Sequence, residues 1–314
     1  MRNMMEGETV AERIHLMPGG EPELIAGLRE QGAEIVGAEQ QPTGVVVTKM
    51  FAQLNLDEVL EANPQVSWVQ LPSAGIEAYQ ETMRRFPEKT WTSAKGAYAK
   101  PVGEHGLLLT LAALRGLKTR ARAQTWGPEG GISLNGLRCV VAGAGGVAAE
   151  LVRLYKAFDT HVTVVRRTGD VLEGADETVT FDRLDEVLDG ADVVGLAAAV
   201  TPGTEKMMGA RQFGLLAEGA VLANVGRGRL VDTDALVDAL RSGRLRGAGL
   251  DVTDPEPLPE GHPLWEQENC LITPHTADTT EMVVPLLRTR VLENHRRLRD
   301  GEPPVGLADP VHGY

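Results

Sequence analysis

The chain has 314 residues, of which 42% are hydrophobic and 24% charged, and this length exceeds that at which one hydrophobic core usually keeps growing. Its net charge of −13 argues against nucleic acid and anionic membranes as main partners, because both carry charge of the same sign. We therefore expect a globular protein of two domains whose partner is a small molecule.

The sequence was also searched for targeting segments and for paired or metal-binding cysteines. No basic start is followed by an apolar stretch, and no apolar run reaches about 18 residues, so we expect neither secretion nor a membrane span. The polar opening at 1–12 is predicted to be a tail. Cys139 and Cys270 each lie in an apolar run, which favours buried thiols over a disulfide or a metal centre. These features suit a reducing cytoplasm, and we expect no metal.

The first hundred residues alternate short apolar strands with amphipathic stretches. The predicted strands are 13–17, 33–36, 45–48, 66–71 and 90–93, and the amphipathic stretches between them are 22–31, 56–62 and 76–84. Strands separated by helices of this length predict a parallel sheet covered on both faces.

A long apolar helix is predicted next, at 102–117, and a polar segment rich in glycine and proline follows at 124–136. A second alternating run extends from 137 to 274. The stretch 279–300 has helical periodicity and ends at Gly301, after which prolines forbid its continuation. The predicted fold class is α/β, with two doubly wound parallel-sheet domains.

The second run begins with a strand, a glycine-rich turn and a helix start, in the form G-x-G-x-x-A. Gly143 makes the turn, Gly145 lets a pyrophosphate approach, and the small Ala148 permits close packing of helix on strand. Gly146 and Val147 open the helix, whose amides and dipole favour phosphate. This pattern predicts a dinucleotide site.

The end of the following strand, 162–165, indicates which dinucleotide binds. An NAD site usually has an acidic residue there, which holds the ribose 2′-hydroxyl. This chain instead has Arg166, Arg167 and Thr168, which suit a 2′-phosphate through charge-assisted hydrogen bonds. We therefore predict NADP, with NAD bound through main-chain contacts as the alternative.

Three groups that suit carbonyl reduction follow in order, each at the end of an apolar run: Arg227 in Asn-Val-Gly-Arg-Gly, Glu256 between prolines, and His275 in Thr-Pro-His. Arginine binds a carboxylate bidentately and stays charged. Imidazole titrates in the working range, and a neighbouring carboxylate favours its protonated form and fixes its tautomer. We predict that Arg227 binds substrate and polarises its carbonyl, His275 donates the proton and Glu256 supports His275.

Together these phrases resemble the catalytic segments of the D-isomer-specific 2-hydroxyacid dehydrogenases. Segments 68–76, 96–105 and 202–204 are also similar to that family, so the resemblance covers nearly the whole chain. It implies a substrate domain of 1–100 plus 279–314 with a flavodoxin-like sheet, and a Rossmann coenzyme domain of 101–278. It also implies a homodimer packed through the coenzyme domains, with 102–117 contributing.

Further contacts are implied by the resemblance alone. The cofactor residues carried over in this way are Ala198, Val200 and Thr204 on the adenosine side, Val225 and Gly226 beneath the nicotinamide, and Asp251 as acceptor of the carboxamide. The amides of Ala74, Gly75 and Ile76, where a strand leads into a helix, are expected to grip the substrate carboxylate, together with Arg227.

The expected reaction is transfer of a hydride from NADPH to C2 of a small 2-oxo acid such as glyoxylate or hydroxypyruvate, which gives a D-2-hydroxy acid. Three alternatives stay open: a nucleotide-sensing protein similar to the C-terminal binding protein corepressors, a phosphite dehydrogenase, and a short phosphoglycerate dehydrogenase. Glu256 argues against a formate dehydrogenase. Side-chain specificity is not assigned, although Tyr79, Tyr98 and Trp265 are candidates for the pocket.

Overall fold

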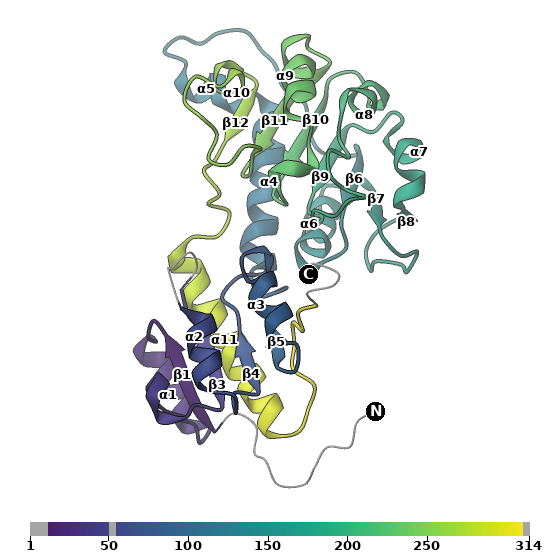
Figure 1. Ribbon diagram of the computed structural model, residues 1–314. Coiled ribbons are helices and arrows are strands. Elements are labelled where there is room, and N and C mark those ends of the chain that lie inside the picture. The colour runs from purple at the N-terminus through teal and green to yellow at the C-terminus, as the bar shows by residue number, and fades with distance from the viewer. Residues whose placement is uncertain (1–11, 50–54, 310–314) are drawn as a thin grey trace. The chain divides into compact units, whose positions relative to one another are not determined.

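The computed structural model describes residues 12–49 and 55–309, and the predicted tail at 1–12 lies outside that part except for Glu12 (Figure 1). The chain divides into two compact units. We call Met1–Tyr98 with Thr280–Tyr314 unit 1, and Ala99–Thr279 unit 2. Each unit contains one parallel sheet with helices on both faces, so the predicted class of two doubly wound α/β domains is confirmed.

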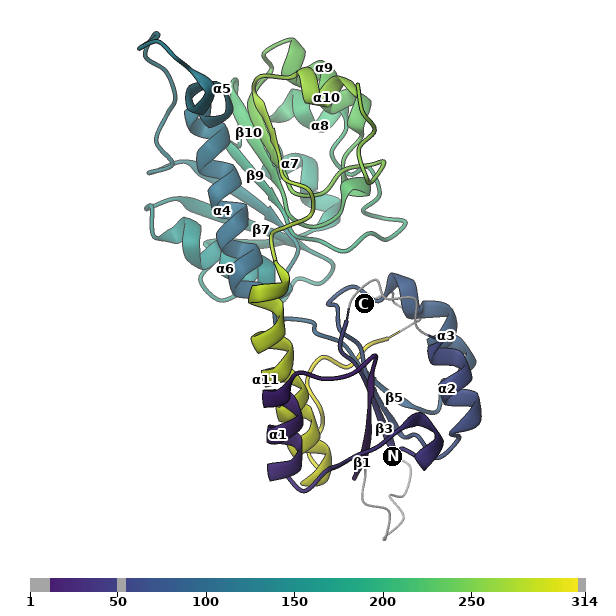
Figure 2. The same cartoon turned by 90° about the vertical axis from the view of Figure 1, so that its left-hand side faces the viewer.

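The unit 1 sheet has the order β2-β1-β3-β4-β5, which is the flavodoxin-like arrangement. Its strands are β1 (Arg13–Met17), β2 (Glu34–Ile35), β3 (Gly44–Val47), β4 (Trp68–Gln70) and β5 (Thr90–Thr92). Helices α2 (Leu56–Ala62) and α3 (Gln80–Arg85) pack on one face, while α1 (Pro22–Glu30) and α11 (Thr280–Arg299) lie on the other (Figure 2). Short 3₁₀ turns lie at η1 (Ala38–Gln40) and η2 (Glu77–Tyr79). The helix predicted at 76–84 is therefore divided between η2 and α3.

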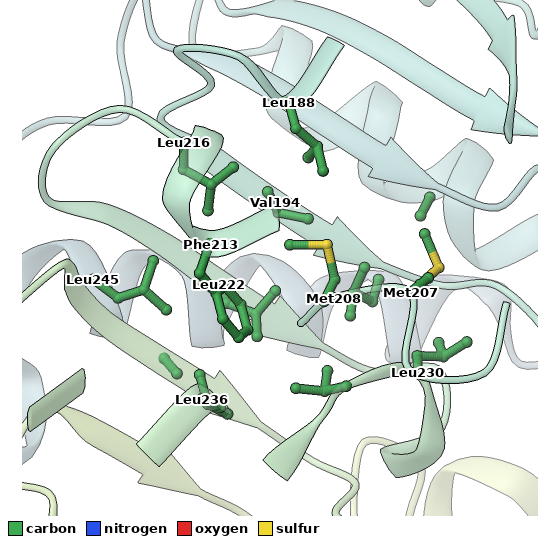
Figure 3. Packing of buried hydrophobic residues seen from close by; sticks show 14 of the residues in the cluster. Leu188, Val194, Met207, Met208, Phe213, Leu216, Leu222, Leu230, Leu236 and Leu245 are labelled. Carbon is green, nitrogen blue, oxygen red and sulfur yellow. The ribbon is translucent and has the colours of Figure 1, made fainter. Parts of the chain in front are cut away.

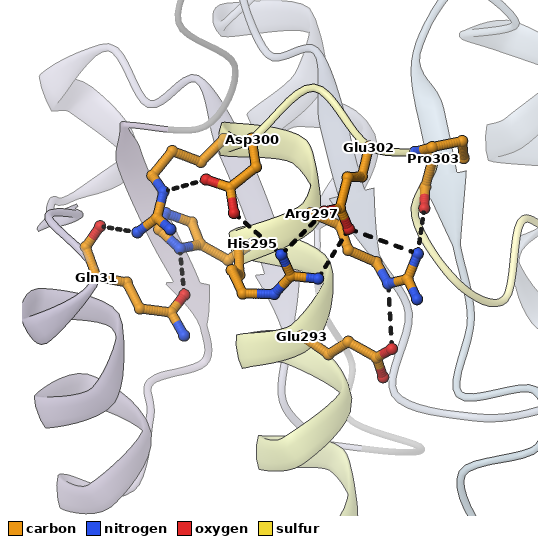
Figure 4. A network of polar contacts seen from close by, with 9 residues as sticks. Gln31, Glu293, His295, Arg297, Asp300, Glu302 and Pro303 are labelled. Atoms are coloured by element: carbon orange, nitrogen blue, oxygen red, sulfur yellow. Dashed lines mark hydrogen bonds and ion pairs between the residues drawn. The ribbon is translucent and has the colours of Figure 1, made fainter.

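The helix α11 is bound to unit 1 by buried polar groups as well as by apolar packing. Asn294, which is fully buried, donates to Gln70 Oε1 at 2.9 Å and to the Val305 carbonyl at 2.9 Å. The buried His295 ring contacts Gln31 Oε1 through Nδ1 at 2.7 Å, within the polar network at the end of this helix (Figure 4). A buried polar group without a hydrogen-bond partner destabilises a fold, so these hydrogen bonds fix the position of α11 on the sheet.

The unit 2 sheet has seven strands in the order β12-β11-β10-β9-β6-β7-β8, so the chain starts in the middle and winds outward in both directions. Its strands are β6 (Arg138–Ala142), β7 (His161–Arg166), β8 (Glu177–Thr180), β9 (Val193–Leu196), β10 (Ala220–Asn224), β11 (Leu245–Leu250) and β12 (Cys270–Ile272). The switch point lies between β6 and β9, where open α/β sheets bind their ligands.

Alternate residues of each strand enter opposite cores. On β6, Cys139 and Val141 face the core shared with α4 (Ala99–Arg115) and α6 (Gly146–Lys156), as the two views show for α4 (Figures 1 and 2). Val140 and Ala142 face the second core, part of which is seen in Figure 3. That core is covered by α7 (Leu184–Leu188), α8 (Ala210–Leu215) and α9 (Thr233–Arg241).

The remaining elements of unit 2 are short: α5 (Leu117–Arg122), α10 (Pro263–Glu266), η3 (Phe181–Arg183) and η4 (Gly228–Leu230). The long helix predicted to run to 117 ends at Arg115. Gly116 has a positive φ of 59° and starts α5 in a new direction, since a glycine accepts this left-handed backbone without strain.

Candidate functional site

The glycine turn after β6 is fixed by a close approach of two loops. Gly143 has φ 117°, and its amide donates to the Val165 carbonyl at 2.8 Å. A Cβ at this position would lie 2.5 Å from the carbonyl oxygen of Ala197, which follows β9. Only glycine is compatible with that backbone and that contact, so the turn crosses the switch point tightly.

The next residues fit a dinucleotide. Gly145 is exposed and is the N-cap of α6, and a Cβ there would meet no atom within 4 Å. Helical residues begin at Gly146 and Val147, whose amides belong to the unsatisfied first turn. Ala148 is fully buried against the sheet, so a small side chain keeps α6 close to β6. The turn thus combines open space with amide donors, as a pyrophosphate requires.

The loop after β7 (His161–Arg166) contains an acidic residue, Asp170, that was not considered in the sequence. Asp170 accepts a hydrogen bond from Thr168 Oγ1 at 2.8 Å, and its carbonyl accepts one from Arg166 Nη1 at 2.9 Å. The Asp170 carboxylate also lies 4.0 Å from Arg166 Nη2 and is 80% exposed. Two of the three groups predicted to bind a 2′-phosphate, Arg166 and Thr168, therefore already contact a carboxylate of the same loop.

The loop after β9 is shaped by Thr204, which is buried. Its hydroxyl donates to the Ala199 carbonyl at 2.8 Å and accepts from the Thr201 amide at 2.8 Å. Ala198 is buried and Val200 half-buried on the same loop, beside the glycine turn. The structure thus shows Thr204 as an organiser of the predicted adenosine-side loop.

Asn224, the last residue of β10, positions the Arg227 loop. Its side chain accepts from the Gly226 amide at 3.0 Å and donates to the Arg227 carbonyl at 2.9 Å. Val225 is buried, and Arg227 is half-buried with Nη1 donating to the Gly226 carbonyl at 2.8 Å. Sequence reasoning gave Asn224 no role, although its place at the end of a buried strand was a signal.

Gly228 brings the Arg227 loop against the loop that carries Glu256. A Cβ on Gly228 would lie 1.9 Å from the carbonyl oxygen of Thr253, so the two backbones are in contact. Thr233 Oγ1 further ties α9 to this second loop by donating to the Asp254 carbonyl at 2.7 Å. The loops after β10 and β11 therefore form one continuous support.

The imidazole of His275 and the carboxylate of Glu256 meet directly. The distance from Nδ1 to Oε1 is 2.5 Å, and both side chains are 40% exposed. His275 has a left-handed backbone with φ 52°. With Nδ1 bound to the carboxylate, Nε2 is the ring nitrogen left to exchange a proton with a ligand. This is the arrangement that general acid catalysis needs.

Asp251 is buried beneath the His275 loop. Its carboxylate accepts from Thr273 Oγ1 at 2.6 Å, from the Thr276 amide at 2.9 Å and from the Ala277 amide at 3.0 Å. Burial acts to raise its pKa, but hydrogen bonds from His105, Thr273 and the two amides outweigh burial and hold the pKa below the usual range. Asp251 is therefore a charged anchor of the loop that bears His275.

A second carboxyl, Asp278, completes this region of unit 2 and was missed in the sequence. Burial raises its pKa, and the nearby charge of Asp251 acts in the same direction, whereas His275 and Arg227 oppose the rise. Its position three residues after His275 was the available signal.

The segment predicted to bind a substrate carboxylate lies in unit 1. Ala74 is exposed, Gly75 half-buried and Ile76 fully buried, directly before η2. Tyr98, a pocket candidate, is buried and donates to the Pro72 carbonyl at 2.6 Å, so it supports this loop from the core. Tyr79 is half-buried, and Trp265 in unit 2 is 44% exposed.

A Rossmann sheet with this glycine turn defines a dinucleotide-binding α/β protein. The family model for the NAD binding domain of D-isomer specific 2-hydroxyacid dehydrogenases matches residues 106–277, and the chain belongs to this family. A Corynebacterium melassecola protein described as an uncharacterized protein in the proB 3′ region is 38% identical over 255 residues, which cover 79% of this chain and 84% of the relative.

Two further relatives have informative names. A glyoxylate reductase of Thermofilum pendens is 28% identical over 268 residues, covering 80% of this chain and 77% of that protein. The crystal structure of a D-isomer specific 2-hydroxyacid dehydrogenase from Xanthobacter autotrophicus Py2, in complex with NADPH and MES, has a TM-score of 0.81 and 26% identity, covering 97% of this chain and all of that chain.

Two negative findings hold for the described part of the chain. Residues 12–49 and 55–309 contain no helix that is both long and apolar enough to cross a membrane. The same residues contain no cluster of three or more histidine, cysteine, aspartate or glutamate side chains suited to a metal ion.

Proposed function

We propose that the protein reduces a small 2-oxo acid of the glyoxylate or hydroxypyruvate type to a D-2-hydroxy acid with NADPH. The contact between His275 and Glu256 carries the proposal, because it pairs a proton donor with a carboxylate in the same unit as the dinucleotide turn. Family membership and the named glyoxylate reductase relative support the reaction class.

The residues of unit 2 fit the cofactor by the open space at Gly145 and the free first turn of α6. In this proposal Gly143, Gly145 and the amides at Gly146 and Val147 hold the pyrophosphate. The loop around Ala198, Val200 and Thr204 faces adenosine, and Val225 with Gly226 lies beneath the nicotinamide. When bound, NADPH supplies the hydride.

Arg227 binds the carboxylate of the substrate and polarises its carbonyl, since a guanidinium stays charged and forms paired hydrogen bonds with a carboxylate. His275 Nε2 gives its proton to the new alkoxide, and Glu256 holds the other ring nitrogen and so fixes the tautomer and orientation of the ring. We also retain Ala74, Gly75 and Ile76 as a proposed carboxylate-binding segment and Asp251 as the proposed acceptor for the carboxamide.

The choice of NADPH over NADH rests on Arg166, Arg167 and Thr168 at the end of β7. Arg166→Gln should weaken NADPH binding by about tenfold or more and leave NADH binding nearly unchanged, because charge-assisted hydrogen bonds are about twice as strong as neutral ones. Fluorescence titration of both cofactors measures this. Equal effects on the two cofactors would remove Arg166 from the phosphate site.

The decisive test is an initial-rate assay that follows nicotinamide absorbance with NADPH and NADH against glyoxylate, hydroxypyruvate, pyruvate and a branched 2-oxo acid. His275→Ala should lower kcat by about 10²–10⁴ while NADPH still binds. His161→Ala is the matched control, because that side chain is 57% exposed on the same unit. NADPH binding without turnover in the wild type would favour a nucleotide sensor, and turnover of phosphite would name the rival enzyme.

We further propose a homodimer that packs through unit 2. Large apolar side chains are exposed there, with Leu108 at 49%, Leu117 at 45% and Trp126 at 100%. Packing against a second copy would remove these apolar side chains from water. Light scattering of the wild type should give a dimer mass, and Leu108→Glu should shift it toward the monomer. A monomeric wild type would end this proposal.

A further inference from the structure

His105, on α4, is a histidine with no part in the proposed chemistry, yet it contacts the loop that carries the candidate acid. Its side chain is 15% exposed. The Nε2 atom lies 2.9 Å from Thr273 Oγ1 and 3.4 Å from Asp251 Oδ1. Three elements meet at this point, since Asp251 follows β11 and Thr273 follows β12.

The direction of these hydrogen bonds follows from the number of protons that each group can donate. Thr273 Oγ1 donates its one proton to Asp251 Oδ1 at 2.6 Å, because an ionised carboxylate can only accept. The hydroxyl oxygen must then accept from the imidazole, and Nε2 of His105 must bear the proton. The result is a directed chain of hydrogen bonds from His105 Nε2 through Thr273 Oγ1 to Asp251 Oδ1.

Asp251 in turn holds the backbone around His275 by hydrogen bonds. Its carboxylate accepts from the two amides that follow His275, and its carbonyl oxygen accepts from the His275 amide at 2.8 Å. The amides of three consecutive residues, His275, Thr276 and Ala277, thus all donate to the buried Asp251. The backbone of His275 is left-handed, a conformation that a non-glycine residue rarely adopts. Such a conformation persists only where its surroundings hold it.

We propose that His105 is a positioning residue for the candidate proton donor His275. It fixes the Thr273 hydroxyl and the Asp251 carboxylate, and through them the loop that presents the His275 ring to Glu256. This inference rests on the proposed function, in which His275 is the acid. His105 itself touches neither reacting atom nor substrate in this proposal.

The first experiment compares His105→Leu with His105→Gln. Leucine removes the donor, whereas the amide nitrogen of glutamine can occupy the place of Nε2 and donate to Thr273. A misplacement of about 1 Å can cost about 10²-fold in rate. We expect His105→Leu to lower kcat by about 10- to 100-fold with the NADPH dissociation constant changed less than threefold, and His105→Gln to recover most of the rate. Equal kcat in the wild type and the leucine variant overturns the inference.

A readout that does not need turnover separates this inference from the proposed function. Imidazole ¹⁵N chemical shifts at fixed pH report the tautomer and hydrogen bonding of each histidine ring, and His275→Ala assigns the His275 signals. His105→Leu should change the His275 signals toward a mixture of tautomers, and His105→Gln should restore them. Unchanged His275 signals in the leucine variant refute the positioning role, whereas an inactive wild type with the expected changes refutes only the reductase assignment.

If His105→Leu does not fold, Thr273→Val tests the same chain, since valine keeps the shape and removes the hydroxyl that links His105 to Asp251. The variant should show the same loss of kcat and the same change in the His275 signals. A folded Thr273→Val with wild-type values for both overturns the inference.

Discussion

Replacement of Glu256 by glutamine tests whether this carboxylate serves catalysis or only stability, because the two roles predict effects of different size. The side chains of Glu256 and His275 are both 40% exposed and 2.5 Å apart at their nearest atoms. An exposed ion pair of this kind contributes about 0.2–1 kcal/mol to stability, so Glu256→Gln should lower the free energy of unfolding by no more than about 1 kcal/mol. Glutamine keeps an oxygen acceptor for Nδ1 and removes only the charge.

The effect on rate should be larger. Two unit charges about 4 Å apart interact by about 1 kcal/mol in water and about 4 kcal/mol at an effective dielectric constant near 20, which correspond to factors of about 5 and about 10³. For a pair that is partly exposed we expect kcat for 2-oxo acid reduction to fall by about 10- to 100-fold.

The assay is the nicotinamide absorbance rate from pH 5 to 9, together with urea unfolding of the same preparation. Glu260→Gln is the control, since it removes one exposed carboxylate from the same loop without touching His275. Two results would refute the reasoning. One is a kcat/KM within twofold of the wild type at every pH, and the other is a loss of more than about 2 kcal/mol of stability with kcat unchanged.

Three further predictions concern the loop at Gly228, the loop at Asp170 and the two buried cysteines. Gly228→Ala should cost about 1–3 kcal/mol of unfolding free energy by urea titration, because the new Cβ would lie 1.9 Å from the Thr253 carbonyl oxygen; a change under 0.5 kcal/mol would show that the loops separate easily. Asp170→Asn should tighten NADPH binding about threefold to tenfold and leave NADH unchanged in a fluorescence titration, because the carboxylate competes for Arg166 and Thr168; weaker NADH binding instead would identify Asp170 as a ribose acceptor. Burial raises the pKa of the Cys139 and Cys270 thiols to about 12, so neither should react with a disulfide reagent at pH 8 until the protein is unfolded.

Much of this architecture was predictable because its signals are local. The strand at Arg13–Met17 and the helix at Leu56–Ala62 were predicted with the bounds that the structure shows, since apolar periodicity and polar breaks are read from neighbours in sequence. The contact between Glu256 and His275 was predicted from two phrases and a chemical requirement.

The supports of the site could not be predicted in this way, because each depends on residues distant in sequence. Nothing near Gly228 reveals that Thr253 lies against it, and His105 is 168 positions from Thr273. Asp170 was overlooked for a different reason. The expected acid was sought at the end of β7, whereas the carboxylate that reaches Arg166 and Thr168 comes from the loop beyond.

The return of α11 to unit 1 has a consequence for the order in which the chain can fold. Unit 2 is a continuous stretch, Ala99–Thr279, and all its strands are synthesised before α11. Unit 1 is made of two pieces, and Gln70, buried beside Asn294, has no such partner until the second piece is synthesised. During translation the first sheet therefore lacks α11 on one face, where only α1 lies, until the end of the chain is made, whereas every strand of the later sheet is made before α11. A nascent chain of this protein thus needs protection at its beginning for longer than in its middle.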